Sequence, residues 1–212
     1  MPDAEESHNS DRLLYLGHAS LRITTQEGKV IYIDPYAGED YSKPADLVLV
    51  THEHYDHNNV AKVQNRNEDI KIITHSEALD TEGYHIFDFG YVKVEAVEAG
   101  YNKNHDKRVC VGYILTLNSG ISIYVAGDTS TTPQMDQLSA YDLDYSFMPT
   151  DGIYNMPAEE ATLAADKVSA KHSVPYHTNP DVLFDQAIAD RFTARNKLEI
   201  HPGEEIVLQK EQ

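Results

Sequence analysis

The fold is decided by the stretch Thr51-His52-Glu53-His54-Tyr55-Asp56-His57, which directly follows the apolar run of residues 47–50. The apolar run predicts a short buried strand that ends where the polar run begins. If the first part of the polar run is extended, side chains two positions apart point the same way, so His52 and His54 can hold one metal ion together. The chain then turns, which places Asp56 and His57 beside the first pair and able to hold a second ion.

The donor types in this run indicate which ions it suits. Neutral imidazole with carboxylate suits Zn²⁺, Fe or Mn²⁺ and has too much nitrogen for a Ca²⁺ site. The alternative is a polar surface loop whose histidines occur there by chance. Four potential ligands within six positions are costly to crowd without a cation, so we expect a metal site.

Short apolar runs separated by turn residues continue on both sides of this stretch and predict mostly strands. The expected strands are residues 12–16, 21–25, 30–33, 47–50, 70–74, 85–89, 91–97, 111–117, 121–126, 145–148 and 205–208. Helices are fewer: one is expected over residues 157–170, and a second is expected to begin at the N-cap Asn179 and run to about Arg195. Many strands with few helices predict a sandwich of mixed layers rather than a doubly wound sheet.

The composition limits the class of protein. A length of 212 residues with 41% hydrophobic content is enough for one substantial core, so we expect a single domain over residues 1–212, with residues 1–11 frayed. Asp and Glu number 35 against 17 Lys and Arg, a formal charge of −18 spread along the chain. This balance repels nucleic acid and is typical of a solvated surface. The expected partner is a small-molecule substrate, and assembly into a homo-oligomer is left open.

The cysteine usage indicates the compartment. Cys110 is the only cysteine and cannot form an internal disulfide, and its neighbours Val109 and Val111 indicate a buried strand thiol. No stretch approaches the roughly 18 apolar residues of a membrane span, and residues 1–11 contain no apolar signal segment. We therefore expect a cytoplasmic protein without a membrane span.

Further motifs accompany the histidine run in a fixed order. They are Tyr15-Leu16-Gly17-His18-Ala19-Ser20, Ile33-Asp34-Pro35, Tyr124-Val125-Ala126-Gly127-Asp128-Thr129 and Val174-Pro175-Tyr176-His177. Together with the Thr-His-x-His-x-Asp-His run, they resemble the metallo-β-lactamase superfamily, and in particular its branch of UlaG-like proteins, which includes the ascorbate-6-phosphate lactonase. The resemblance covers residues 13–208 and implies an α+β fold, the four-layer αββα sandwich. The central motif is specific for the superfamily and says little about the substrate.

The resemblance also implies two adjacent metal sites that share one carboxylate. The implied ligands are His52 and His54 for the first ion, Asp56, His57 and His177 for the second, and Asp128 as the bridge. Asp128 follows an apolar strand beside Gly127, where a carboxylate needs a cation or several hydrogen bonds, and a turn role is the alternative. His177 alone would be read as a structural histidine, and the accompanying motifs reverse that reading.

The sequence departs from the family pattern at the third histidine of the first site. Most relatives place it just after the strand equivalent to residues 92–97, whereas here the chain reads Glu98-Ala99-Gly100-Tyr101-Asn102. The nearest histidine is His105, and we expect it to complete the first site. The alternatives are Asn102 or water in its place, or a centre that holds one metal only.

Three further residues are weaker candidates. Asp34 ends a buried strand and is suited to orient a metal-bound imidazole, with an Asp-Pro turn as the alternative. His18 either faces the pocket or makes a structural hydrogen bond, and the second reading is favoured slightly. Tyr154 lies on a loop that the resemblance brings near the metals, where it could contact the substrate.

The implied chemistry is hydrolysis. Two cations close together can lower the pKa of a bridging water towards about 7 and polarise a carbonyl or phosphoryl oxygen. Asp56 and Asp128 are the carboxylates that can both bind metal and accept the proton of the water. We expect two divalent ions, with zinc favoured over manganese or iron, and an ester, lactone or phosphodiester of a small metabolite as substrate.

Two other functions remain open at this point. A non-catalytic metal-binding or sensor module gains some support from the altered third histidine. A di-iron redox protein of the same fold is compatible with the His and Asp ligands, although the lone Cys110 is not placed as part of a redox pair. A nuclease is disfavoured, because binding to a phosphate backbone depends on clustered Lys and Arg that this chain lacks.

Overall fold

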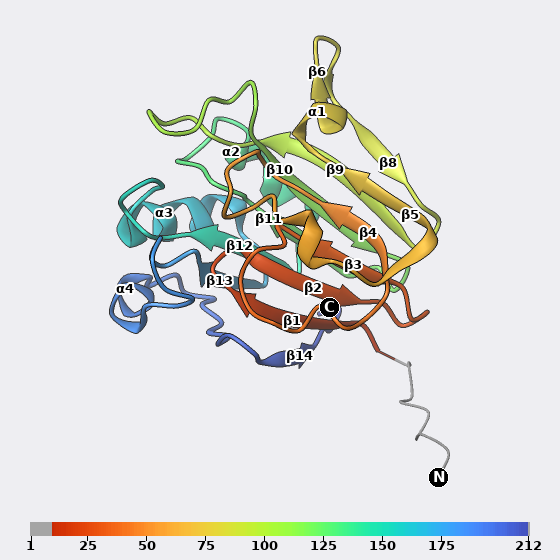
Figure 1. Ribbon diagram of the computed structural model, residues 1–212. Coiled ribbons are helices and arrows are strands. Elements are labelled where there is room, and N and C mark those ends of the chain that lie inside the picture. The colour runs from red at the N-terminus through yellow and green to blue at the C-terminus, as the bar shows by residue number, and fades with distance from the viewer. Residues whose placement is uncertain (1–9, 212) are drawn as a thin grey trace.

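The computed structural model describes residues 10–211, and Figure 1 shows strands at the centre with helices to one side of them. Residues 1–9 of the segment expected to be frayed lie outside the described residues. Asp11, which belongs to the same segment, is instead buried, and its Oδ1 accepts a hydrogen bond of 2.8 Å from the backbone N–H of Gln26. None of the helices within residues 10–211 combines the length and hydrophobicity needed to cross a lipid bilayer.

Two mixed sheets of six strands each form the centre of the molecule (Figure 1). The order along the first sheet is β14 (Glu205–Val207), β1 (Arg12–Gly17), β2 (Ser20–Thr24), β3 (Val30–Ile33), β4 (Ala45–Leu49) and β5 (Arg66–Ile73). The order along the second is β13 (His172–Tyr176), β12 (Tyr145–Pro149), β11 (Ser122–Val125), β10 (Val111–Leu117), β9 (Val92–Glu98) and β8 (Ile86–Asp88). A separate small hairpin pairs β6 (Leu79–Asp80) with β7 (Gly83–Tyr84).

The main core lies between the two sheets. Along β9, Val92 and Val94 are buried in this core, whereas Lys93 between them is exposed, as the alternation of side chains along a strand requires. Leu13 and Tyr15 of β1 enter the same core from the first sheet and are fully buried. Burial of apolar area from both sheets is therefore what holds them face to face.

Helix α3 (Ala158–Val168) covers the outer face of the second sheet. Its residues Ala161, Ala165 and Val168 are buried in a cluster with Ile114 and Tyr124 of that sheet, while Glu159 and Glu160 occupy its first turn. The remaining α-helices and one 3₁₀ helix are short: α1 (His75–Ala78), α2 (Met135–Leu138), η2 (Ser139–Tyr141) and α4 (Gln186–Arg191).

The outer face of the first sheet has a thinner cover. The 3₁₀ helix η1 (Val60–Lys62) lies here, and Tyr41 and Val63 pack with Tyr32 and Val48 of the sheet. Tyr41 stacks on Tyr32 with their ring centroids 5.2 Å apart. The expected α+β sandwich with a layer outside each sheet is confirmed, and one of its outer layers consists of a loop and a single short turn.

The C-terminal third differs from expectation in two places. The helix expected from Asn179 to Arg195 is only α4, because Asp185 caps it by accepting a hydrogen bond from the backbone N–H of Ile188, and the preceding residues form a loop. Strand β13 was not predicted, because His172, Ser173 and Pro175 weaken the apolar pattern. Pro175 is tolerated there since β13 is an edge strand of the second sheet.

The strand directions bring many candidate residues to one end of the sandwich. Strands β3 and β4 run parallel, and so do β11, β12 and β13. The loops after the carboxyl ends of these strands carry Asp34, His52, Asp128, Asp151 and His177. Three residues here have left-handed backbone angles that non-glycine residues rarely adopt, with φ of 46° at Asp34, 44° at His177 and 52° at His18. Strained backbone of this kind concentrates at functional sites.

Candidate metal centre

The loop after β4 places its ligand candidates as the spacing predicts. The ring centroid of His52 lies 4.6 Å from that of His54 and 4.2 Å from that of His57. The turn between them is closed by a hydrogen bond of 3.0 Å from the backbone N–H of His57 to the carbonyl of His54. His52 and His57 are buried, whereas His54 faces outward.

His105 joins the first pair. The residues His52, His54 and His105 each offer a donor atom within 4.8 Å of the others, and His105 is buried. The ring of His105 lies 5.1 Å from His52 and 5.0 Å from His54, measured between centroids. Asn102 turns its Oδ1 towards the chain and accepts hydrogen bonds of 2.9 Å from the backbone N–H groups of Asn104 and His105. The structure therefore brings His105 to the other two histidines and uses Asn102 to shape the loop that presents it.

A second group forms around Asp56, His57 and His177. Nε2 of His57 lies 3.8 Å from Oδ2 of Asp56, and Nε2 of His177 lies 3.9 Å from the same oxygen. Asp128 stands between the two groups. Its Oδ1 is 3.3 Å from Nε2 of His57, and its Oδ2 is 3.4 Å from Nε2 of His177 and 3.2 Å from Nε2 of His105. The carboxylate of Asp128 thus reaches both groups, which is the position a bridging ligand needs.

Two buried carboxylates fix the orientation of two imidazoles. Nδ1 of His57 lies 2.8 Å from Oδ2 of Asp34, which also accepts the hydroxyl of Thr51 at 2.7 Å. Nδ1 of His177 lies 3.2 Å from Oδ2 of Asp151. Holding Nδ1 in this way directs Nε2 of each ring towards Asp128 and leaves it free to bind a metal.

Asp151 was missed by the sequence reasoning. It lies two residues after the buried strand of residues 145–149, whereas Asp34 comes directly after residues 30–33, so an acidic residue close to the end of a buried strand was the available signal. The carboxylate is buried, and its Oδ1 also accepts the backbone N–H groups of Ile153 and Tyr154 at 2.6 and 2.7 Å. Asp151 therefore links the orientation of His177 to the position of the loop that carries Tyr154.

His18 contacts the second group directly. Its Nε2 lies 2.9 Å from Oδ2 of Asp56, and its ring centroid lies 3.8 Å from that of His177. Its carbonyl accepts a hydrogen bond of 2.9 Å from the backbone N–H of His177, which joins the β1–β2 turn of the first sheet to the end of β13 in the second. Both readings of His18 therefore apply, since it makes a structural bond through its backbone and faces Asp56 with its side chain.

Burial and neighbouring charges together shift the pKa values of the clustered side chains. Burial raises the pKa of Asp128, but His177 and His57 lower it well below its ordinary value. Burial lowers the pKa of His57, yet Asp128 and Asp34 raise it well above its ordinary value. Burial lowers the pKa of His52, and His57 lowers it further. Asp128 is thus held ionised, and His52 is held neutral with a lone pair available for a cation.

The donor atoms at the centre fit a metal ion. Nε2 of His52, His57 and His177 and Oδ1 of Asp128 are buried and find no hydrogen-bond partner among the described residues. Leaving buried polar atoms unpaired costs free energy, and coordination to a cation would remove that cost. Imidazole nitrogens around a shared carboxylate form a donor set that suits zinc, iron or manganese.

A pocket of about 270 Å³, which we call the histidine pocket, opens onto this centre. It is lined by Asp56, Asp128 and His177 on the inside and by Tyr55 and Tyr154 further out. The structure therefore places Tyr154 where the sequence reasoning expected it. A neighbouring pocket of about 290 Å³ shares His54 and His105 with it.

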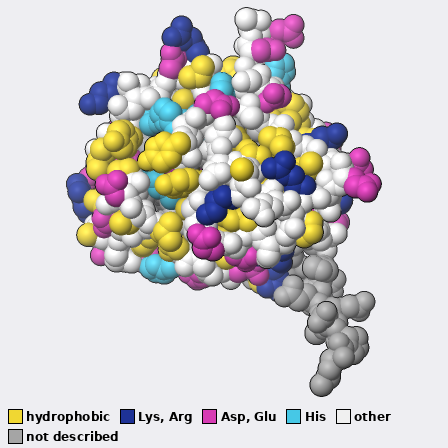
Figure 2. All heavy atoms as spheres, viewed as in Figure 1, with side chains coloured by type: hydrophobic (Ala, Val, Ile, Leu, Met, Phe, Trp, Pro, Cys, Tyr) yellow, Lys and Arg dark blue, Asp and Glu magenta, His cyan; other side chains and the backbone are white. Residues whose placement is uncertain are grey.

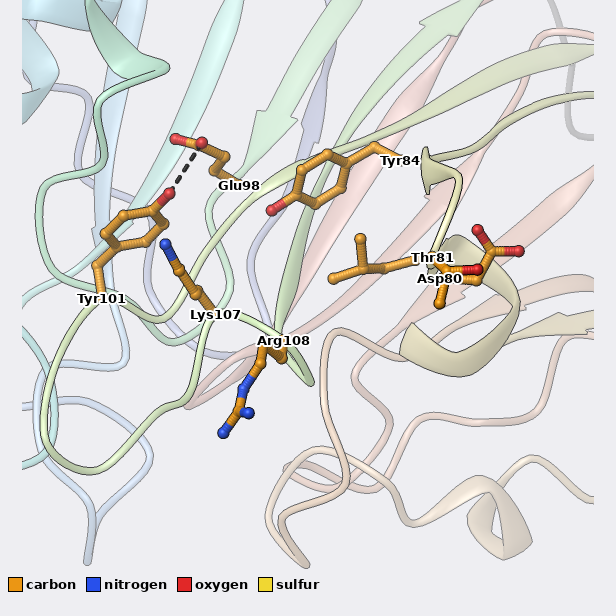
Figure 3. A pocket seen from close by; sticks show the side chains of 8 residues that line it. Asp80, Thr81, Tyr84, Glu98, Tyr101, Lys107 and Arg108 are labelled. Atoms are coloured by element: carbon orange, nitrogen blue, oxygen red, sulfur yellow. Dashed lines mark hydrogen bonds between the residues drawn. The ribbon is translucent and has the colours of Figure 1, made fainter.

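A larger hollow of about 600 Å³ lies away from the histidines. Figure 3 shows Lys107 pointing towards Tyr101 and Glu98, with Tyr84 across the hollow. The hydroxyl of Tyr101 donates a hydrogen bond of 2.8 Å to Glu98, drawn as a dashed line in Figure 3. No metal-ligand candidate lines this hollow among the described residues, so the smaller histidine pocket is the candidate active site.

Comparison with known proteins identifies the family. The sequence pattern of the beta-lactamase superfamily domain matches residues 12–177, which include every ligand candidate described above. The chain belongs to this superfamily. The expectation of a metallo-β-lactamase fold is thereby confirmed, and the departure at the third histidine does not remove the chain from the superfamily.

Individual members of the superfamily show how far the likeness extends. The chain is 31% identical over 196 residues to a UPF0173 metal-dependent hydrolase of Anoxybacillus flavithermus, covering 79% of this chain and 86% of the relative. It superposes on Igni18, a metallo hydrolase from the archaeon Ignicoccus hospitalis, with a TM-score of 0.72 at 24% identity, covering 95% of this chain and 100% of that one. CmlA, a diiron β-hydroxylase of Streptomyces venezuelae, gives a TM-score of 0.69 at 13% identity, covering 94% of this chain and 54% of that one.

The two solved structures share the fold of this chain, and the hydrolase relative from Anoxybacillus flavithermus is also similar to it in sequence. Together with the superfamily match, the hydrolase relative confirms the prediction that this superfamily member is an enzyme of the metal-dependent hydrolase class.

Proposed function

We propose that the chain hydrolyses an ester, lactone or phosphodiester of a small metabolite at a centre of two divalent ions, with zinc the favoured metal. The observation that carries the proposal is the position of Asp128, whose two oxygens reach Nε2 atoms of His57, His105 and His177 within 3.4 Å. A carboxylate shared in this way between two groups of imidazoles suits a pair of cations.

The proposed ligands divide into two sets. The first ion would be held by His52, His54 and His105, the second by Asp56, His57 and His177, and Asp128 would contact both. When bound, the ions supply Lewis acidity and lower the pKa of a coordinated water. The centre opens into the histidine pocket, so a substrate of limited size can reach it.

The protein's own groups then position the reactants. The carboxylate of Asp56 is partly exposed in the pocket and can take the proton of the attacking water on Oδ2. His18 lies 2.9 Å from that oxygen and holds it in place. Asp34 and Asp151 keep the imidazoles of His57 and His177 oriented, which preserves the geometry during turnover.

Three finer assignments also belong to the proposal. We place the chain in the UlaG-like branch, on the motifs around His18, Asp34, Asp128 and His177. We treat residues 1–212 as a single domain, because both sheets contribute to one core among the described residues. A cytoplasmic location stays a prediction.

Metal analysis combined with a substrate panel tests the proposal. The purified protein is analysed for metal by mass spectrometry, stripped with a chelator, and reloaded with Zn²⁺ or Mn²⁺. Each form is assayed on aryl esters, lactones and phosphodiesters. We expect about two metal equivalents and turnover that disappears on stripping and returns on reloading. Metal binding without turnover of any of the three classes would overturn the proposal and favour the sensor module.

The redox alternative has a separate signature. Superposition on CmlA shows that a diiron enzyme can share this fold and says nothing of the chemistry here. Bound iron with visible absorption and reactivity towards oxygen would favour that function over hydrolysis.

A further inference from the structure

Exposed apolar side chains lie at the histidine pocket and on loop residues next to its lining residues in sequence. Tyr55, Ile153, Tyr154 and Val182 are between 49% and 76% exposed, although large apolar side chains are normally turned inward. Tyr55 and Tyr154 line the pocket themselves, and Ile153 and Val182 are the immediate neighbours of lining residues in sequence. We call these four residues the apolar collar. Figure 2 shows hydrophobic side chains gathered on this face, with histidine side chains among them.

Contacts hold parts of the collar in place. The ring of Tyr55 lies edge-on to that of Tyr36 at 5.8 Å between centroids, and Tyr36 in turn contacts His18. The loop carrying Ile153 and Tyr154 is anchored from below by Asp151. Exposed aromatic side chains that line a concave site, as Tyr55 and Tyr154 do, are typical of a binding surface rather than of scattered exposed residues.

Lysine and arginine are absent from the lining of the site among the described residues. No Lys or Arg lines the histidine pocket or the neighbouring pocket among the described residues, whereas Asp56 and Asp181 line the first and Asp106 the second. The loop that carries His105 does contain basic residues, but none of them lines these two pockets. Lys107 and Arg108 line the larger hollow of Figure 3, and Arg108 pairs with Asp106. A substrate with an anionic group away from the cleaved bond would therefore meet carboxylates and apolar surface, with no Lys or Arg to pair with.

From this arrangement we infer that the substrate carries an aryl or alkyl group, which the apolar collar contacts, and no charged group away from the cleaved bond. The inference rests on the proposed hydrolytic function and narrows it, since it excludes substrates with a carboxylate or phosphate away from the cleaved bond. The collar is assigned to the substrate rather than to a second copy of the chain because two of its residues line the pocket over the candidate centre.

A matched pair of esters tests the charge preference on the metal-loaded protein. Phenyl acetate is uncharged, and 4-acetoxybenzoate places a carboxylate at the far side of the same ring without making the leaving phenol a poorer one. We expect kcat/KM for phenyl acetate to exceed that for 4-acetoxybenzoate by about tenfold, because the carboxylate would be desolvated without a counter-ion.

Variants test the collar itself. Tyr55→Ser and Tyr154→Ser, alone and combined, remove its aromatic rings, and Tyr141→Ser is the matched control because Tyr141 is an exposed tyrosine that lines neither pocket. For phenyl acetate, we expect each collar variant to raise KM by about fivefold with kcat nearly unchanged, as the loss of one aromatic contact requires. The control should match the wild type.

A binding measurement makes the inference independent of turnover. Nile red, an uncharged dye that fluoresces in apolar surroundings, is titrated into each metal-loaded protein. We expect the combined collar variant to bind it at least about fivefold more weakly than the wild type and the Tyr141→Ser control.

The outcomes of these experiments distinguish failure of the inference about the substrate from failure of the proposed hydrolysis. Equal or faster turnover of 4-acetoxybenzoate would overturn the inference and leave hydrolysis standing. Collar-dependent dye binding without turnover of any ester, lactone or phosphodiester would support the apolar site and overturn the proposed hydrolysis. Equal dye binding by all variants, or a collar substitution that changes the oligomeric state and leaves the ester ratio unchanged, would overturn the inference.

Discussion

Nδ1 of His57 lies 2.8 Å from Oδ2 of Asp34, and both side chains are fully buried. Asp34 also accepts the backbone N–H of Thr51 at 2.8 Å and the hydroxyl of Thr51 at 2.7 Å. One carboxylate thus fixes the start of the histidine loop and the ring at its end. The same residue connects the stability of the fold to the geometry of the candidate metal centre.

Asp34→Asn is expected to weaken the second metal site by about 10- to 100-fold, because the amide holds the tautomer and orientation of His57 less well. Competition with a chromophoric chelator measures this affinity. Asp144→Asn is the matched control, since Asp144 is also fully buried and accepts the backbone N–H and hydroxyl of Ser122 far from the centre. Equal metal affinities in the two variants would show that Asp34 serves the fold alone.

His105→Ala should lower the metal affinity of the first site by about tenfold or more, since one of three imidazoles is removed. Asn102→Ala should have a smaller effect, because Asn102 supports the loop through backbone hydrogen bonds. Two-site occupancy measured by mass spectrometry in both variants and in the wild type separates these roles. His75→Ala serves as the control, as it replaces a nearby histidine outside the proposed ligand set. Full occupancy and activity of His105→Ala would show that another group completes the site.

Asp56→Ala and Asp128→Ala are each expected to lower kcat by about 100-fold or more, because these carboxylates would hold the ions and the attacking water. Circular dichroism should show an unchanged fold. Asp181→Ala removes a third carboxylate that lines the same pocket and should leave kcat within about threefold of the wild type. If activity survives in both Asp56→Ala and Asp128→Ala, the mechanism proposed here is wrong.

Metal binding should strengthen as pH rises. Burial lowers the pKa of His57 and His177, but Asp128 raises both above their ordinary values, with Asp34 and Asp151 acting in the same direction. The stability that these raised pKa values give the metal-free fold is present below about pH 6.5 and is lost as pH rises through the folded-state values. A metal must displace the protons on Nε2, so binding releases protons and is weaker at low pH.

The increase in Tm caused by Zn²⁺ should therefore be larger at pH 8 than at pH 6. Differential scanning fluorimetry at the two pH values measures it, and calorimetry in two buffers of different ionisation enthalpy counts the protons released. A Tm increase that is the same at both pH values, with no proton release, would contradict the prediction.

Cys110 should resist modification in the native protein. Burial raises the pKa of its thiol to about 12, so almost no reactive thiolate is present at neutral pH. We expect Ellman's reagent to label the folded protein only slowly, and to label one thiol per chain at once after denaturation. Rapid labelling under native conditions would show that the neighbouring pocket, which Cys110 lines, opens widely in solution.

Much of the centre could be predicted because its ligands lie close together in sequence. His52, His54, Asp56 and His57 needed only the two-residue period of an extended chain and one turn. His105 was harder to assign, since it does not directly follow β9 but comes after a loop. The contact of His105 with Asp128 depends on a hydrogen bond from the backbone N–H of Gly100 to the carbonyl of Asp128. No local sequence pattern predicts that bond.

The features that could not be predicted from the sequence are positioned by tertiary contacts. Asp151 has the same local signature as many turn-forming aspartates, and only the parallel pairing of β12 with β13 places it behind His177. Asn179 and Pro180 have the sequence of a helix start, yet the helix begins only after Asp185, whose backbone N–H donates to the hydroxyl of Thr178 in the loop beside the pocket. Exposure of the apolar collar could not be read from the sequence either, because tyrosines also fill the core at Tyr15 and Tyr113.

The proposed metal ligands come from both sheets, so the order in which the ribosome makes the chain limits when the metal ions could bind. The loop after β4 supplies donors near residue 54, whereas the last donor is His177 at the end of β13. A nascent chain that has reached only residue 150 carries the His52–His57 loop but not the ring that would complete the second site. Even the bond between the carbonyl of His18 and the backbone N–H of His177, which joins the two sheets here, must wait for that residue. With the proposed ligand set, full metal loading would therefore follow translation of β13, the last strand of the second sheet.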